Sequence, residues 1–222
     1  MAVHILWDWN GTLLDDTQAA LDTLNIMLAK RGAAPIAMDF YRDHFAFPVR
    51  PFYKSIGVCL ENEDWDALAR EYHDIYARQP KRLNAEAIAA LERAKAAGAR
   101  QAIISALRQD LLDAATAALG VATYMDLVYG VDNLDGASKL DRARELLKAI
   151  ALPGGSAGEP VDVCLIGDAL HDKEVADALG IRCVLCAQGS HAAWRLRAVA
   201  PTGDTLLEAV DLALADAERR AI

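Results

Sequence analysis

Five short apolar runs recur along the chain, and each is bounded by turn-forming or helix-like sequence. They are VHILW at 3–7, RQAIIS at 100–105, MDLVYG at 125–130, VDVCLIG at 161–167 and IRCVLCA at 181–187. Runs that are apolar throughout, rather than alternating with polar residues, are typical of parallel strands buried on both faces. Because helical patterns separate them, the sequence predicts an α/β fold: a doubly wound, mainly parallel sheet with helices on both sides.

The segments between these runs carry helical periodicity and helix end signals. LNAEAIAALERAKAAG ends at Gly98 and QDLLDAATAALG ends at Gly120, both with glycine where a helix commonly stops. SKLDRARELLKAI begins at Ser138, a candidate N-cap. EVADALG predicts a helix after the fourth strand, PGGSAGEP a loop before that strand, and the tail from 204 to 222 a final amphipathic helix.

The gap between the first two strands departs from this alternation. Residues 16–83 contain several helical patterns, among them TQAALDTLNIMLAKRG and EDWDALAREYHDIYARQ, and no convincing strand. This is far more chain than an ordinary crossover needs. We therefore expect a core domain of residues 1–15 and 84–222, interrupted by an all-helical cap domain of residues 16–83.

Composition narrows the class of partner. The 222 residues are 54% hydrophobic and carry a formal charge of −9, which suits a compact globule and offers no footprint for nucleic acid or an anionic membrane. No stretch approaches the roughly 20 apolar residues of a membrane span, and the chain starts directly with a strand-like run. We expect a cytoplasmic protein, monomeric or homodimeric.

The cysteines fit the same interpretation. Cys164, Cys183 and Cys186 lie inside apolar runs and are most simply buried thiols. Cys183 and Cys186 have the CxxC spacing of redox and zinc sites, but the strand-like run that contains them favours the structural role.

Polar side chains that could bind a metal or take part in a reaction follow the strands. Asp8, Ser105 and Asp168 each stand at or just after the end of an apolar run, and Asp172 follows four residues later in GDALHD. Ligands of open α/β sheets bind at the carboxyl ends of the strands, so these side chains are expected at one rim. Three carboxylates there suit an oxygen-seeking ion such as Mg²⁺.

Two further residues suit phosphoryl transfer. Ser105 could donate a hydrogen bond to a phosphoryl oxygen, and Lys139 at a helix start could add a positive charge. Singly, each of these residues has an ordinary structural role as a turn residue, a helix cap or a solvated charge. Their order along the chain, DxxGT, then Ser, then Lys, then GDxxxD, each at a strand or helix end, favours the catalytic interpretation.

At this level the chain resembles the haloacid dehalogenase-like hydrolase superfamily, in particular its phosphoglycolate phosphatase-like branch with a helical cap. DWNGTLLDD is similar to the first motif, which implies that Asp8 is the nucleophile. IISA is similar to the second and SKLDRARELL to the third, although Leu140 stands where a proline is often found. GDALHD is similar to the fourth. The resemblance implies substrate contacts at Thr12, Ser105, Ala106 and Lys139, and Mg²⁺ held by Asp8, the backbone carbonyl of Asn10, Asp168 and Asp172.

Within the cap, FAFPVRPFYKSIG is similar to the segment that carries the substrate-specificity loop. The resemblance makes Arg50 the candidate for gripping the far end of a substrate, as an alternative to a solvated surface arginine. The implied reaction is hydrolysis of a small phosphorylated metabolite, such as phosphoglycolate, through an aspartyl-phosphate.

Asn10 departs from the family pattern. Most phosphatases of the superfamily have a second aspartate here, which protonates the leaving group and then activates water. An amide can keep the backbone contact to the metal but cannot transfer a proton. General acid–base help is worth about 10²–10⁴ in rate, so a slower enzyme, an accumulating aspartyl-phosphate or transfer to another acceptor are all consistent with Asn10. Asp15, Asp16 and His171 are the nearby titratable groups that could replace it.

Two alternatives remain at the level of sequence. A phosphonoacetaldehyde hydrolase-like enzyme would form a Schiff base with a cap lysine, for which Lys54 is available, although nothing around it suggests the apolar pocket such a lysine needs. A degenerate relative would bind a phosphorylated ligand without turnover, but a pure binder has no need of the nucleophile Asp8.

Overall fold

The computed structural model describes residues 2–58, 63–131, 139–151 and 161–221. A six-stranded sheet runs through the core, and all its paired neighbours are parallel. In spatial order the strands are β5 (Leu127–Val131), β4 (Arg100–Arg108), β1 (Ala2–Trp7), β6 (Val161–Gly167), β7 (Arg182–Cys186) and β8 (Thr202–Gly203). The chain thus winds from the central β1 first to one side and then to the other, which confirms the doubly wound α/β class.

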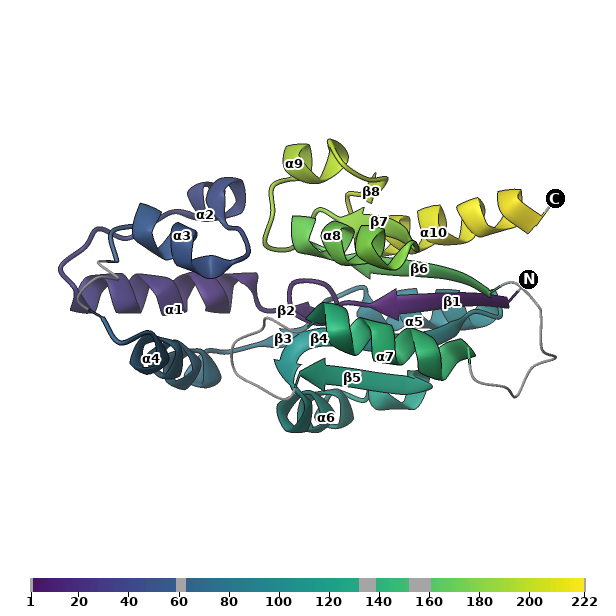
Figure 1. Ribbon diagram of the computed structural model, residues 1–222, viewed down its shortest axis with the longest axis horizontal. Helices are drawn as coiled ribbons and strands as arrows, with labels where there is room; N and C mark the ends of the chain where they lie inside the picture. Colours follow the sequence, from purple (N-terminus) through teal and green to yellow (C-terminus); the bar gives the residue numbers. More distant parts are fainter. Residues whose placement is uncertain (1, 59–62, 132–138, 152–160, 222) are drawn as a thin grey trace.

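Helices cover both faces of this sheet (Figure 1). Helices α5 (Ala87–Ala96), α6 (Gln109–Ala118) and α10 (Leu206–Ala221) contribute to the hydrophobic cluster on one face, and α7 (Lys139–Ala151) and α8 (Leu170–Leu179) to the cluster on the other. The short helices η2 (Ala122–Tyr124) and α9 (Ala193–Arg197) lie in connections. The predicted core helices are therefore confirmed with boundaries shifted by a few residues.

The central strands divide their side chains between these two clusters. In β1, Ile5 and Trp7 pack against α5 and α10, whereas Leu6 packs against α7 and α8. In β6, Ile166 and Leu165 divide in the same way. Both faces of the strands are thus buried, which is why these runs are apolar without alternation.

The segment inserted after β1 is helical. It contains α1 (Thr17–Lys30), α2 (Met38–His44), α3 (Val49–Ser55) and α4 (Trp65–Arg78), and these helices share a hydrophobic cluster distinct from the two clusters of the sheet. Figure 1 shows them at the end of the molecule where the carboxyl ends of the strands point, away from the two termini. We call this segment the cap.

A two-stranded antiparallel pair stands at the base of the cap. Strand β2 (Leu14–Asp15) enters the cap and β3 (Arg82–Leu83) leaves it, with Leu14 opposite Leu83. We propose that this pair marks the border between the predicted domains, core 1–15 and 84–222 and cap 16–83. The sequence gives no strand signal for two residues, so neither β2, β3 nor β8 was predicted.

One predicted boundary was wrong. The second apolar run was expected to end at Ser105, but β4 continues to Arg108, and its register with β5 shifts between Ile104 and Arg108. Ala106 and Leu107 continue the strand past Ser105 and Arg108 ends it, so the polar Ser105 interrupts the apolar run without ending the backbone pairing. The N-cap predicted at Ser138 and the loop at 153–160 lie outside the described residues.

The three cysteines predicted to be buried thiols lie in the core or pack against it. Cys164 and Cys186 are fully buried in one cluster while Cys183 packs against the other, so the CxxC pair points to opposite faces of β7. Burial raises the pKa of the Cys164 and Cys186 thiols to about 12, which keeps them protonated. A redox or metal role for this pair has no geometric basis.

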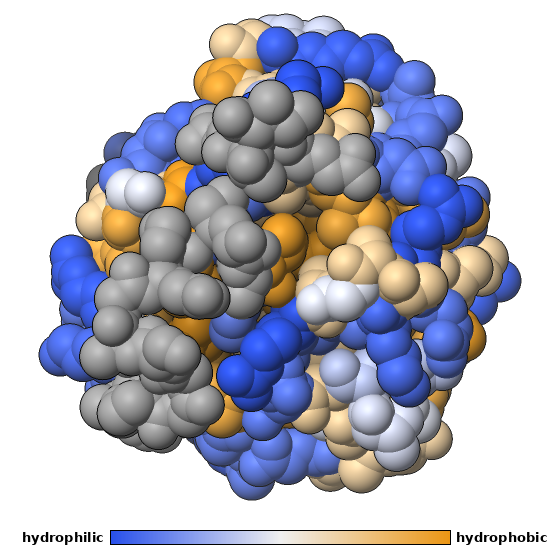
Figure 2. Space-filling model, turned by 90° about the vertical axis from the view of Figure 1, so that its right-hand side faces the viewer, coloured by the Kyte–Doolittle hydropathy of each residue, from blue (hydrophilic) through white to orange (hydrophobic). Residues whose placement is uncertain are grey.

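The far end of the core, where the strands begin, is seen face-on in Figure 2. Hydrophobic residues show there between hydrophilic ones, as on an ordinary protein surface. Within the part of the chain that the structure describes, no helix combines the length and the apolar character that crossing a bilayer requires.

Candidate active site

Three carboxylates meet at the carboxyl edge of the sheet. Asp8 follows β1, Asp168 follows β6 and Asp172 lies in the first turn of α8, and all three are buried. One oxygen from each lies within 4.8 Å of the others. The structure thus brings together the acids that the sequence predicted for one rim.

The backbone fixes these acids by close approach. Asp8 N–H donates to Ile166 O at 2.8 Å, which continues the pairing of β1 with β6 past the last strand residue. Asp172 Oδ2 accepts from the backbone N–H groups of Asp168 and Ala169, at 3.1 and 3.0 Å. A Cβ at Gly167 would lie 2.2 Å from the Asp172 carboxylate, so glycine is required there.

The turn after Asp8 has a similar requirement. Gly11 has a φ of +77°, and a Cβ added to it would lie 2.3 Å from Asp168 Oδ2. Thr12, fully buried, has its Oγ1 3.4 Å from both Asp8 Oδ2 and Asp168 Oδ1. The Gly-Thr pair of the first motif therefore positions the acids as well as closing the turn.

Lys139 is the cation among these acids. At the start of α7 it is 3% exposed, and its Nζ donates to Asp8 Oδ1 and, at 2.5 Å, to Asp172 Oδ1. Burial alone would lower the pKa of Lys139, but the Asp172 and Asp8 carboxylates outweigh it and raise this pKa above its usual range. The lysine is therefore charged at neutral pH.

One lysine does not balance three buried carboxylates. Burial, opposed by Lys139, raises the pKa of Asp8 well above its usual range, and burial together with Asp172 raises the pKa of Asp168. Carboxylate oxygens that converge under excess negative charge are the donor set that a hard divalent cation such as Mg²⁺ prefers. The residues present therefore fit the predicted metal.

Ser105 lies at the same edge but faces the protein. It is 1% exposed, and its Oγ accepts a hydrogen bond from Leu107 N–H at 3.0 Å. Ala106 and Leu107, the next two residues, line the cavity described below. The predicted second motif thus reaches the site, and in this arrangement Ser105 holds its turn.

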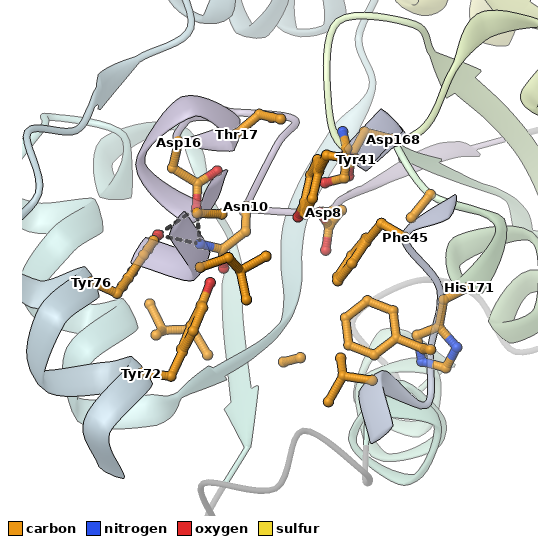
Figure 3. Close-up of a pocket in the computed structure, with 18 of the residues that line it drawn as sticks. Asp8, Asn10, Asp16, Thr17, Tyr41, Phe45, Tyr72, Tyr76, Asp168 and His171 are labelled. Carbon is orange, nitrogen blue, oxygen red and sulfur yellow. Dashed lines mark hydrogen bonds between the residues drawn. The ribbon is translucent and has the colours of Figure 1, made fainter. Parts of the chain in front are cut away.

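Asn10 takes part in a network that links core and cap (Figure 3). Its Nδ2 donates to Asp16 Oδ2 at 2.7 Å and to the Tyr76 hydroxyl at 3.0 Å. The Tyr76 hydroxyl donates to the same Asp16 oxygen, and Gly11 N–H donates to Asp16 Oδ1 at 2.7 Å. Both amide hydrogens of Asn10 are engaged, which leaves its Oδ1 as an acceptor.

The three titratable groups suggested as replacements for an acid at position 10 differ in their surroundings. Asp15 is partly exposed and pairs with Arg82 at 2.9 Å. His171 contacts Glu174 at 3.1 Å and lies against Phe47. Asp16 alone contacts Asn10, and it is 5% exposed. Burial raises the pKa of Asp16, although hydrogen bonds from Tyr76 and Asn10 oppose that rise.

A cavity of about 250 Å³ separates the acids from the cap. Figure 3 shows Asp8 and Asp168 on one side of it and Tyr72 and Tyr76 of α4 on another. Its described lining combines catalytic-edge residues with aromatic side chains of the cap. These aromatic residues are Tyr41, Phe45, Phe47, Tyr53, Trp65, Tyr72 and Tyr76.

Two cap residues that the sequence suggested as functional, Arg50 and Lys54, lie outside the described lining of the cavity. The guanidinium of Arg50 is stacked 4.4 Å from the centroid of the Trp65 ring, and Arg50 is exposed and does not line the described cavity. Lys54 is exposed too. It lacks the apolar surroundings that a Schiff-base lysine requires.

Sequence reasoning missed Tyr72 and Tyr76. They stand four residues apart on an amphipathic helix, a spacing that identifies one helix face but fits a buried core stripe equally well. Only the packing of α4 over the strand ends gives that face to the cavity.

Comparison with known proteins places this arrangement in context. The family model for haloacid dehalogenase-like hydrolases matches residues 5–186. Phosphoglycolate phosphatase from Caulobacter vibrioides is 28% identical over 192 residues, 83% of this chain and 79% of that protein. The phosphoglycolate phosphatase of Rhodobacter capsulatus is 27% identical over 202 residues, 85% of this chain and 86% of that protein.

A solved structure extends the likeness of fold to nearly the whole chain. A haloacid dehalogenase-like family hydrolase from Streptococcus pneumoniae superposes with a TM-score of 0.74 at 18% identity. The match covers 96% of this chain and 98% of that one.

Proposed function

The chain belongs to the haloacid dehalogenase-like hydrolases and is a phosphatase of that family, and we propose that it hydrolyses small phosphate monoesters with Mg²⁺ through an aspartyl-phosphate on Asp8. The observation that carries the proposal is the contact of Lys139 with both Asp8 and Asp172 beside Asp168 at one end of the cavity between core and cap. Phosphoglycolate names both relatives and is the candidate that this similarity suggests, whereas the lining of the cavity favours a monoester with an uncharged leaving group.

The proposed metal site uses Asp8, Asp168, Asp172 and the backbone carbonyl of Asn10. When bound, Mg²⁺ would neutralise charge on the phosphoryl group and on the carboxylates. Lys139 would hold a phosphoryl oxygen through its charged ammonium group, and Ala106 would border the phosphoryl pocket, with Thr12 and Ser105 buried behind it.

In the first step, an Asp8 carboxylate oxygen forms a bond to phosphorus while the bond from phosphorus to the ester oxygen breaks. In the second step, water takes the place of Asp8 at phosphorus and frees the carboxylate. No side chain at position 10 can transfer a proton in either step, so Asn10 contributes an acceptor at Oδ1 that can orient the attacking water.

The cap supports this function by covering the site. Its aromatic residues line the cavity opposite the acids, and apolar walls strengthen the interactions of charged groups beside them. We propose no Schiff-base chemistry, since Lys54 is exposed on α3.

The test measures release of orthophosphate from a panel of phosphate monoesters that includes phosphoglycolate, with Mg²⁺ and with a chelator. We expect metal-dependent turnover that falls by about 10⁴-fold or more in Asp8→Asn, because removal of a nucleophile abolishes the covalent route. Turnover that survives Asp8→Asn would show a different reaction. Absence of turnover for every monoester would show a protein that binds without turnover.

A further inference from the structure

The cap side of the cavity carries an aromatic wall. We use this name for Phe45, Phe47, Tyr53, Trp65 and Tyr72, which come from α3, α4 and the segment before α3. Their rings contact one another: Phe45 lies 5.3 Å from Phe47, and Tyr53 lies 5.9 Å from Trp65, between centroids. Figure 3 shows Phe45 and Tyr72 beside the space in front of Asp8.

This wall offers no permanent positive charge to a substrate. Lys139 is the one lysine or arginine among the described lining residues, and it is engaged by Asp8 and Asp172. Arg42 of α2 donates instead to the carbonyls of Gly189 and Gln188, and Arg50 is stacked on Trp65. Residues 59–62, 132–138 and 152–160 contain no lysine, arginine or histidine in the sequence.

The histidines of the lining do not change this balance. His171 lies beside Glu174, and His73 packs edge-on against Tyr72. The acids outnumber the cations in the lining, since Asp16 adds a fourth carboxylate. A substrate with its own carboxylate would place it against the aromatic wall, where no lysine or arginine of the described lining faces it, and burying a carboxylate without a matching cation costs free energy.

The size of the cavity suits one ring. An apolar cavity of about 150 Å³ is large enough to bind benzene. The 250 Å³ here therefore accommodates a phosphoryl group at the acids and a single aromatic ring against the wall. Such a ring would find edge and face contacts with Phe45 and Tyr72.

Asn10 supplies an independent argument about the leaving group. It cannot donate a proton, and both of its amide hydrogens are held by Asp16 and Tyr76. Position 10 therefore gives a leaving oxygen no proton, which favours one that can depart as an anion. A phenolic oxygen has a pKa near 10, against about 16 for water and comparable alcohols, so a phenolate leaves far more readily without an acid.

We propose that the substrates are aryl phosphates: phosphate monoesters of a phenolic oxygen on one uncharged ring. This proposal rests on the phosphatase function proposed above and names its substrate class. Asp8 forms a bond to phosphorus as the bond to the aryl oxygen breaks, and the aryl oxide leaves with the electron pair. Water then forms a bond to phosphorus as the Asp8–phosphorus bond breaks. One proton of that water stays on the released phosphate and the other neutralises the aryl oxide in solution.

The first experiment compares turnover of phenyl phosphate and phosphoglycolate by the full chain with Mg²⁺. We expect kcat/KM for phenyl phosphate to exceed that for phosphoglycolate by at least about 10²-fold, the lower end of what general acid help is worth. A ratio near or below one overturns the proposal while leaving the phosphatase function intact. No turnover of any monoester overturns both.

The second experiment measures binding without turnover. Phenylphosphonate and phosphonoacetate are the non-hydrolysable probes, and we expect the dissociation constant of phenylphosphonate to be at least about tenfold lower, because only the ring matches the wall. Tighter binding of phosphonoacetate would mean that the cavity takes a second anion, which contradicts the proposal.

A charge variant tests the cause. Ala69 lies on α4 and lines the cavity outside the catalytic residues. Ala69→Arg should tighten phosphonoacetate and weaken phenylphosphonate, whereas the neutral control Ala69→Met should not favour phosphonoacetate. Two results would show that the absence of a cation does not select the substrate. One is a wild type that binds phosphonoacetate more tightly than phenylphosphonate, and the other is an equal change in the two dissociation constants in Ala69→Arg and Ala69→Met.

Discussion

At the scale of single residues, Asn10 and Asp16 form one unit. Asn10 Nδ2 lies 2.7 Å from Asp16 Oδ2, so Asn10→Asp would put two carboxylates where an amide and a carboxylate now share a hydrogen bond. Like charges so close raise a pKa and repel, and the new acid would not hold its position. Asp16, the last residue of the DWNGTLLDD motif, is therefore as much a part of the site's chemistry as Asn10.

This pairing predicts that an exchange restores acid–base help better than a single substitution. The double variant Asn10→Asp with Asp16→Asn keeps the net charge and lets the new amide donate to the new carboxylate. We expect kcat/KM for an alkyl phosphate to rise by about 10²–10⁴, with a smaller gain for Asn10→Asp alone. Asp16→Asn alone is the control and should give no rise. An unchanged rate in the double variant would show that proton transfer at position 10 does not limit the enzyme.

At the scale of elements, the sequence predicted the strands and helices whose hydrophobic pattern reflects burial in the core. All five long strands and the helices between them follow their apolar runs, because both faces of the sheet are covered. It did not predict β2, β3 and β8, two residues each, or the end of β4 at Arg108. Such short ladders are set by tertiary pairing rather than by local preference.

The candidate site also contains residues that the sequence could predict and residues that it could not. The acids and Lys139 could be predicted because each stands at the end of an element whose position the fold determines. The aromatic wall and the place of Arg50 could not, since they depend on how the cap helices rotate and pack over the strand ends. Helical periodicity gives a face but not what that face meets.

The start of α8 gives a prediction for pH. His191 is 1% exposed, its Nδ1 accepts from Leu170 N–H at 3.0 Å, and burial followed by the nearby Arg195 lowers its pKa to about 4. In the unfolded chain, the His191 imidazole takes up a proton near pH 6.5. The buried neutral His191 therefore contributes fully to stability above pH 6.5, and this contribution is lost as the pH falls toward 4.

His191→Gln keeps an acceptor for Leu170 but cannot titrate in this range. Between pH 7.5 and 4.5, the free energy of unfolding of the wild type should fall by about 2–3 kcal/mol more than that of the variant. Urea unfolding at the two pH values measures the difference. Parallel losses in both proteins would mean that His191 does not carry the charge change.

At the scale of the whole molecule, the cap has its own hydrophobic cluster, the core has one on each face of its sheet, and the site lies between cap and core. The contact of Tyr76 with Asn10 joins α4 of the cap to the turn after β1 of the core. The same hydroxyl donates to Asp16, where the cap begins. Position of the cap and orientation of Asn10 are thus coupled through one side chain.

Removal of that hydroxyl should loosen both. Tyr76→Phe deprives the buried Asp16 carboxylate of one donor, which we expect to lower the free energy of unfolding by about 1.5–3 kcal/mol. Tyr72→Phe, one helical turn earlier on the same cavity wall, removes a hydroxyl outside this network and is the matched control. Urea unfolding of the two variants side by side measures the effect, and equal losses would refute the special role of Tyr76.

The central claim is that Asp8 carries the phosphoryl group during turnover. Its most direct test is acid quenching of the enzyme during turnover of phenyl phosphate with Mg²⁺, followed by intact-mass and peptide analysis. Because Asn10 cannot activate water, we expect a phosphoryl group to accumulate on Asp8, and to be absent from Asp8→Asn and from the chelated enzyme. Turnover with no phosphoryl group on Asp8, or with the group on another residue, would contradict it.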